Sequence, residues 1–196
     1  MKKSVTTLSC LLLLIACNAQ QQTPQLLKLP ANWQFERFVL PPQFAPGITY
    51  KGAEELRFSP GMFHKDSTTY FTYAFVSELD STNSISQNEI RNYLLNYFKG
   101  LCSSTARQRK LSIDTSKISV EIENKEPRGN NVLYTAVLNI FGVFTDGAPV
   151  KLNMEIKVMN NKTSFKTYLV IIASPLDKTN AVWKELYAIQ KDFTIP

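Results

Sequence analysis

The stretch Val150–Val158 constrains the fold more than any other part of the chain. Its apolar and polar residues alternate without interruption, which is the pattern of a β-strand with one buried face and one solvated face. Asp146-Gly147 precedes it and Asn160-Asn161 follows it, and both pairs favour the tight turns that join antiparallel strands. Residues 132–173 are therefore predicted to form three consecutive antiparallel strands.

Further strands and two helices are predicted on either side of these three strands. Strand patterns occur at Thr69–Leu79 and Ile118–Ile122, and a proline-flanked edge strand is expected at Trp33–Leu40. A capping-box pattern at Ser86–Glu89 predicts the start of one helix, and apolar spacing over Val182–Phe193 predicts another, capped within residues 177–179. The expected fold is α+β: a mainly antiparallel sheet of about five to six strands with two helices packed on one face.

The first residues have the pattern of a secretory signal peptide. Lys2 and Lys3 supply a positive start, and Leu8–Ile15 supplies an apolar run too short to anchor the chain across a bilayer. At its end stands Leu14-Ile15-Ala16-Cys17, which resembles the lipobox of bacterial lipoproteins. The resemblance implies cleavage before Cys17 and acyl chains, palmitate among them, on its sulfur and amino group. Cleavage after Ala19 is the alternative.

This pattern divides the chain into a signal peptide at 1–16, a lipidated cysteine and polar tether at 17–25, and one domain at 26–196. Several acyl chains would hold the protein stably at a membrane. The residue after Cys17 is Asn18. Lipoproteins kept at the inner membrane carry Asp at that position, so the resemblance favours the outer membrane. The predicted location is the bacterial cell envelope, with a soluble periplasmic or secreted protein as the alternative.

The charge of the chain is mildly basic. The formal net charge is +6, of which two units belong to the predicted leader, and no dense basic stripe supports binding to nucleic acid. Arg107, Arg109 and Lys110 cluster near the predicted end of the first helix. They suit the negative end of the helix dipole, and alternatively they suit an anionic partner such as lipid headgroups or an acidic glycan.

Aromatic residues crowd the proline-rich stretch before Phe63. Trp33, Phe35 and Phe38 are the candidates for an aromatic groove that holds a sugar or a peptide, with plain packing against the core as the alternative. The same region, Trp33–Leu40, is an edge at which another protein can add a strand.

The sequence offers little material for catalysis or cofactor binding. His64 is the only histidine, no serine lies in a nucleophile elbow, and Cys102 is the only cysteine outside the leader region. Cys102 is expected to be a buried apolar residue. These counts exclude the usual zinc sites, and the glycines form no phosphate-binding loop. No metal, cofactor or catalytic residue is predicted.

Carboxylates are the remaining chemistry. Glu54 with Glu55, Glu78 with Asp80, and Asp146 are candidates for a paired-acid hydrolase or a calcium site. Each has a simpler interpretation, because neighbours on a strand point apart and acids on a wet strand face serve solubility. The expected function is a non-enzymatic envelope lipoprotein, an accessory module that binds a protein or glycan. The alternatives are a secreted hydrolase and a structural protein that pairs through a sheet edge.

Overall fold

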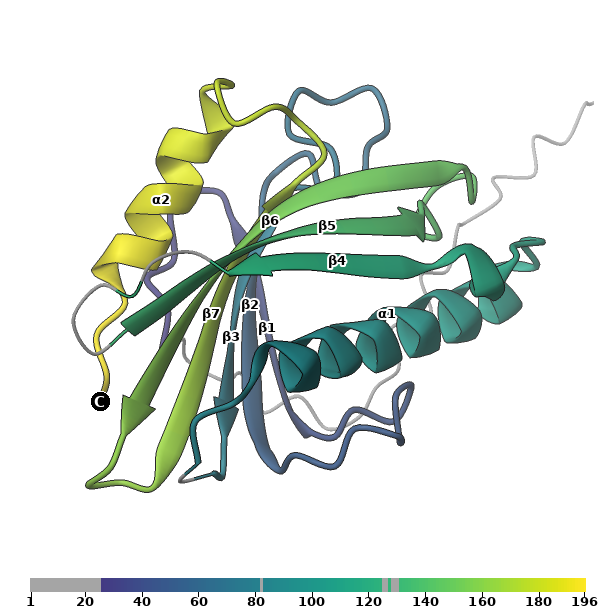
Figure 1. Cartoon of the computed structure of the whole chain (residues 1–196). Coiled ribbons are helices and arrows are strands. Elements are labelled where there is room, and N and C mark those ends of the chain that lie inside the picture. Colours follow the sequence, from purple (N-terminus) through teal and green to yellow (C-terminus); the bar gives the residue numbers. More distant parts are fainter. Residues whose placement is uncertain (1–25, 82, 125–126, 128–130) are drawn as a thin grey trace, which may run out of the picture.

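The computed structural model describes residues 26–81, 83–124, 127 and 131–196, which form one antiparallel sheet flanked by two helices (Figure 1). The predicted leader and Cys17 lie outside these residues. The elements, in chain order, are β1 (Gln34–Leu40), β2 (Gly52–Phe58), β3 (Tyr73–Leu79), α1 (Gln87–Arg109), a short 3-10 helix (Thr115–Lys117), β4 (Ser119–Asn124), β5 (Asn131–Phe141), β6 (Pro149–Asn161), β7 (Lys166–Ser174) and α2 (Val182–Asp192).

The sheet has seven strands in the order β1-β2-β3-β7-β6-β5-β4, with every neighbouring pair antiparallel. The α+β class and the three-strand unit β5-β6-β7 are confirmed, and β1 is an edge strand as predicted. The strand count of five to six was wrong because β2 was missed. Glu54, Glu55 and Arg57 lie in β2 and interrupt its apolar pattern, although all three side chains are buried.

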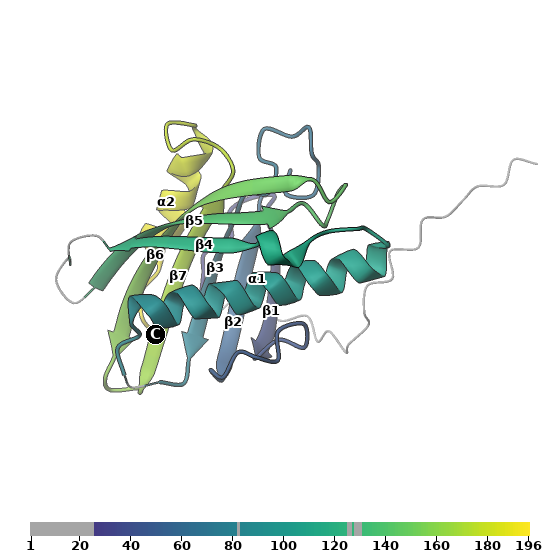
Figure 2. The same cartoon turned by 45° about the vertical axis from the view of Figure 1, so that its right-hand side comes forward.

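The two helices lie on opposite faces of the sheet, so the prediction that both pack on one face was wrong. Figure 2 shows α1 in front of the sheet and α2 behind it. The reason is that β3 and β7 are apolar on both faces. Tyr73 and Phe75 belong to the core under α1, whereas Ala74 and Val76 belong to a separate core under α2.

Helix α1 begins where the capping box predicted. Ser86 Oγ accepts a hydrogen bond from the Glu89 amide, and the Glu89 carboxylate accepts one from the Ser86 amide, so both ends of the motif are satisfied. The helix ends at Arg109, and its C-cap residue Lys110 adopts a left-handed conformation with φ of 58°. Cys102 is buried on the inner side of α1, as predicted, and burial raises the pKa of its thiol to about 11.

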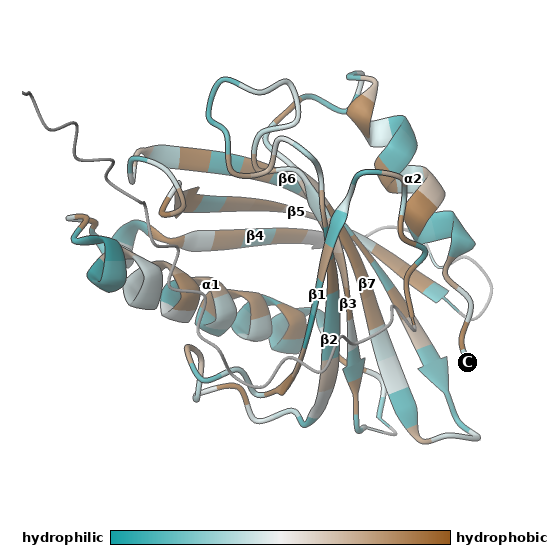
Figure 3. Cartoon of the chain, turned by 180° about the vertical axis from the view of Figure 1, so that it is seen from behind, coloured by the Kyte–Doolittle hydropathy of each residue, from teal (hydrophilic) through white to brown (hydrophobic). Residues whose placement is uncertain are grey.

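Helix α2 covers β3 and β7 on the other face. Val182, Leu186, Ile189 and Phe193 are buried as predicted, and the banded hydropathy of α2 is visible from behind in Figure 3. The predicted cap at 177–179 was wrong: Asp177 bonds the Thr179 amide in a turn, and Asn180 accepts from the first helical amide, at Val182. Leu27 and Trp33, from the segment before β1, complete this second core.

Candidate functional site

The sheet has two ends that differ in what they present to solvent. Gly52 pairs with Leu79, which pairs with Thr167, and we call this the Gly52 end. At the other end, which we call the Phe58 end, Phe58 pairs with Tyr73. A surface depression lies at each of these two ends.

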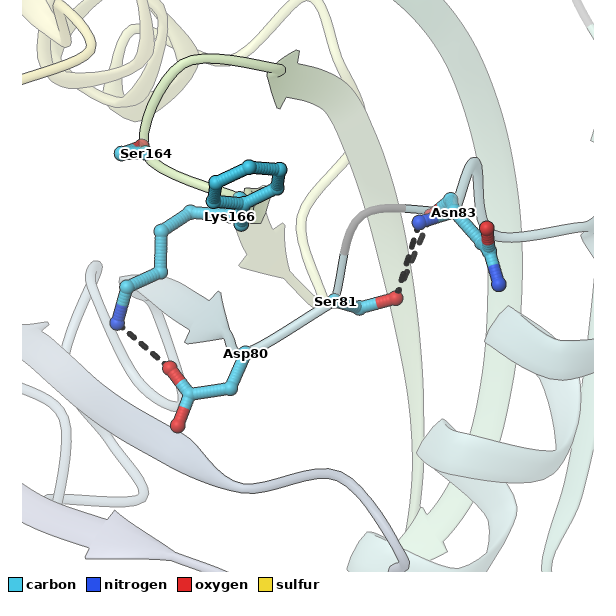
Figure 4. Close-up of a pocket in the computed structure, with 6 residues that line it drawn as sticks. Asp80, Ser81, Asn83, Ser164 and Lys166 are labelled. Atoms are coloured by element: carbon cyan, nitrogen blue, oxygen red, sulfur yellow. Dashed lines mark hydrogen bonds and ion pairs between the residues drawn. The ribbon is translucent and has the colours of Figure 1, made fainter.

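The depression at the Gly52 end lies between the loop after β3 and the turn that joins β6 to β7 (Figure 4). Its lining is mostly polar, with one aromatic ring. The lining residues are Asp80, Ser81, Asn83, Ser164, Phe165 and Lys166.

Hydrogen bonds and ion pairs fix the two loops against each other. Lys166 Nζ donates to Asp80 at 2.6 Å and to Glu78 at 3.0 Å, and these bonds raise the pKa of the lysine. The buried Thr167 hydroxyl lies within hydrogen-bond distance of the Ser81 carbonyl, at 3.1 Å. Phe165 has a positive φ of 56° and a side chain that is 64% exposed. The site therefore presents an exposed aromatic ring beside acids that are paired with Lys166.

The depression at the Phe58 end contains the only histidine of the chain. Trp33, His64, Asp66 and Glu185 border it, together with the loop that begins at the Ser59–Met62 turn. In that turn the Met62 amide donates a hydrogen bond to the Ser59 carbonyl at 3.0 Å. The mixture of an indole edge, an imidazole and two carboxylates suits a polar ligand or a partner side chain.

Glu54 lies completely buried between the sheet and α1. Ser77 Oγ donates to its Oε2 at 2.6 Å and the Tyr93 hydroxyl donates to the same oxygen at 2.9 Å, while Oε1 has no hydrogen-bond partner among the described residues. Desolvation raises the pKa of Glu54 to about 7, against the opposing effect of the surrounding hydroxyls. The Tyr73 hydroxyl in the same region is also buried without a partner in the described chain.

Glu55 lies on the other face of β2 and is equally buried. Its carboxylate accepts hydrogen bonds from the backbone amides of Leu26 and Leu27 at 3.1 and 3.0 Å, and it forms an ion pair with the buried guanidinium of Arg57. Arg57 in turn donates to the carbonyls of Leu27 and Lys28. We call this arrangement the Glu55–Arg57 clasp. It fixes residues 26–28, at the start of the domain, to the middle of β2.

The clasp has support from neighbouring side chains. Arg37 on β1 approaches the Glu55 carboxylate at 3.4 Å. The guanidinium of Arg57 also lies 5.7 Å from the centre of the Phe35 ring, a favourable cation–π distance. Two backbone amides, two backbone carbonyls, Arg37 and one aromatic ring therefore surround this buried ion pair, as a stable buried charge requires.

The predicted basic cluster lies at the C-terminal end of α1, and all three side chains are exposed. Arg107 and Arg109 are in the last turn, where they complement the helix dipole, and Lys110 is the cap residue. Arg109 also donates to the Thr145 carbonyl at 3.2 Å. The structure thus places these residues where they stabilise the end of α1. Their binding to an anionic partner stays a prediction.

The three residues of the predicted aromatic groove do not gather in one place. Trp33 is buried in the core under α2 and borders the Phe58-end depression. Phe35 lies against Arg57. Phe38 points to the α1 face, where it packs edge-on against Phe44 with ring centres 6.2 Å apart. Strand alternation separates Phe35 from Phe38, so a single groove lined by all three does not form.

The predicted acid pairs have three different outcomes. Glu54 and Glu55 point to opposite faces, as expected, but both are buried, so the interpretation of them as solvated acids was wrong. Glu78 and Asp80 are brought together, with Lys166 between them. Asp146 pairs with Lys65 and accepts from the Ala148 amide in its turn. Within the described ranges, no three histidine, cysteine or acidic side chains cluster as metal ligands.

Comparisons with family models, with curated proteins and with solved structures find no significant match to this chain. In the part of the chain that the structure covers, neither helix has the length and apolar character needed to cross a membrane.

Proposed function

We propose that the protein is a non-enzymatic lipoprotein of the bacterial envelope, held to a membrane through acyl chains on Cys17 and acting as a binding module. The Glu55–Arg57 clasp is the observation that carries this proposal. It bonds the backbone of residues 26–28 to the sheet directly after the polar segment 20–25. Because residues 26–28 are bonded to the sheet, a lipid anchor on Cys17 would hold the whole domain at the membrane.

Two features favour binding over catalysis. The carboxyl pairs proposed for a hydrolase point apart at Glu54 and Glu55, or share one lysine at Glu78 and Asp80. Glycosidase chemistry needs two opposed carboxyls about 5 to 9.5 Å apart with a substrate between them. Glu54 and Glu55 lie on opposite faces of β2, and Lys166 bonds to both Glu78 and Asp80. The depression beside Trp33 and His64 is the surface we propose for the ligand or partner, with a glycan or an envelope protein as the expected class.

Pairing through the β1 edge is the second candidate function. Val39 on this strand is 75% exposed. Glu36 and Arg37 stand at its centre, however, and two copies paired about the middle of β1 would place Arg37 opposite Arg37 or Glu36 opposite Glu36. Like charges directly opposite weaken a strand pair, so the edge suits a different chain better than a second copy.

The anchor is tested by expression of the full chain in a bacterium with its own leader. The wild type is expected in the detergent fraction with an intact mass that includes acyl chains, and Cys17→Ala is expected in the soluble fraction. A soluble wild-type protein that begins at Gln20 would show that the lipoprotein proposal is wrong.

The binding role is tested by native mass spectrometry of the protein after incubation with an envelope extract. A reproducible small adduct that is lost in Trp33→Ala supports the Phe58-end site. Release of cleaved glycan or peptide fragments without any adduct would favour the hydrolase.

A further inference from the structure

The Glu55–Arg57 clasp also sets the direction in which the chain leaves the domain. Lys28 contacts Arg57, and Leu26 contacts Glu55. Read backwards along the chain, the segment therefore runs along β2 from Arg57 towards Gly52. At Leu26, the first described residue, the backbone is therefore directed towards the Gly52 end of the sheet.

The length of chain that remains is short. From Leu26 back to Cys17 an extended chain spans at most about 30 Å, and a flexible one averages about 17 Å. An anchor on Cys17 would therefore keep the Gly52 end near the membrane, and the Phe58 end would point away from it.

The most exposed large apolar side chains gather at that same end. Val39 is 75% exposed and Phe165 is 64% exposed, whereas the other large apolar side chains classed as exposed in the described residues reach 38%. Val39 pairs with Ala53, beside Gly52, and Phe165 precedes the first residue of β7. Exposed apolar side chains of this kind suit contact with the outer part of a lipid layer.

The charged side chains at the Gly52 end also suit contact with a lipid layer. Lys51 and Lys162 are exposed at the Gly52 end and form no ion pair with a described residue. The acids nearby, Glu78 and Asp80, are already paired with Lys166. An anionic lipid surface attracts exposed basic residues such as these.

We propose that the Gly52 end is a membrane-contact surface, on which Val39 and Phe165 enter the interface of the bilayer while Lys51 and Lys162 face its headgroups. This inference rests on the proposed lipid anchor at Cys17. The depression shown in Figure 4 then faces the bilayer, and the depression beside His64 faces away from it.

The experiment measures the depth of two matched labels in the lipidated full chain. Thr163 and Thr68 are both exposed turn residues, at the Gly52 end and the Phe58 end respectively. Thr163→Cys and Thr68→Cys are each labelled with a fluorophore, and Cys102 does not compete because it is buried. The proteins are placed in vesicles of phosphatidylcholine and phosphatidylglycerol that contain a headgroup-quencher lipid.

Quenching is expected to be several-fold stronger at position 163 than at position 68. Adding Phe165→Ser and Val39→Ser is expected to reduce the quenching at 163, whereas Phe63→Ser, which alters an exposed ring at the other end, leaves it unchanged. Equal quenching at both positions, or stronger quenching at 68, would overturn the proposed orientation while the intact mass still shows the acyl chains. An unmodified Cys17 in a soluble protein would instead overturn the lipoprotein proposal, and this inference with it.

Discussion

Glu54 and Glu55 are adjacent in the sequence and both are completely buried, yet their surroundings are opposite in kind. Glu55 faces a guanidinium and two backbone amides, which compensate a negative charge. Glu54 faces only hydroxyl groups and aromatic rings, and the neighbouring Glu36 adds to the rise in its pKa. The comparison teaches that burial alone does not decide whether an acid is charged; the donors on its own face of the strand decide it.

Of the substitutions around Glu54 and Glu55, removal of Glu55 should lower the free energy of unfolding the most. Glu55→Ala leaves Arg57 buried without its counter-charge, and breaking a buried pair in this way costs about 3 to 5 kcal/mol. Urea unfolding of the mature chain measures the loss. The double variant Glu55→Ala with Arg57→Met should lose less than the sum of the two single variants. Additive losses would show that the two side chains do not act as a pair.

Replacement of Glu54 should change the pH dependence of stability. Because the folded state raises the pKa of Glu54 from 4.5 to about 7, it holds the proton more tightly than the unfolded chain does. The free energy of unfolding should therefore fall as pH rises from about 4.5 to about 7 and then level off, by about 3 kcal/mol at 1.36 kcal/mol per pH unit. Glu54→Gln should remove this fall in urea unfolding between pH 5 and pH 8.

A surface acid provides the matched control for that measurement. Glu121 is exposed on β4, so Glu121→Gln should keep the wild-type pH profile. If Glu54→Gln also kept that profile, the assignment of the near-neutral titration to Glu54 would fail.

Tyr93→Phe should have a smaller effect, which is a shift in the pKa of Glu54. The variant removes a hydroxyl that donates to the Glu54 carboxylate at 2.9 Å, and this donor favours the charged form. The pKa of Glu54 should rise further, by about one pH unit or less for a bond worth about 1 kcal/mol. The midpoint of the pH-dependent fall in stability should move upward; a downward shift would contradict the arrangement described.

Tyr73→Phe should change the stability of the fold least. The Tyr73 hydroxyl is buried and accepts or donates no hydrogen bond within the described residues, so its removal deletes a polar group that gains nothing from burial. We expect a change within about 1 kcal/mol, with stabilisation as the favoured direction. A loss of more than that in thermal unfolding would reveal a partner for this hydroxyl.

The sequence predicted those elements whose side chains follow the period of their own structure. The alternation in β6 and the Ser86–Glu89 capping box each indicated one local structure, and each was confirmed. The strand β2 was missed because Glu54, Glu55 and Arg57 hide its apolar pattern. The partners of the two glutamates include Ser77, Tyr93 and Leu26, which lie 23 to 39 residues away. Such long-range compensation has no local signal.

The placement of the helices failed for a related reason. Apolar residues on both faces of the predicted strand Thr69–Leu79 were visible in the sequence, but nothing local showed that α2 would return to the face opposite α1. Trp33, Phe35 and Phe38 were candidates for one groove, with packing against the core as the other interpretation, and strand alternation places Phe35 and Phe38 on different faces.

The clasp has a practical consequence for where this domain begins. A shortened chain that starts after Lys28 would lose two amides and two carbonyls that Glu55 and Arg57 use, and would leave both charged side chains facing a vacated surface. Proteases that trim the polar segment should likewise stop near Leu26, since the backbone beyond it is bonded to the sheet. The boundary of the folded unit is thus set by two side chains in β2, about thirty residues further along the chain than the point they fix.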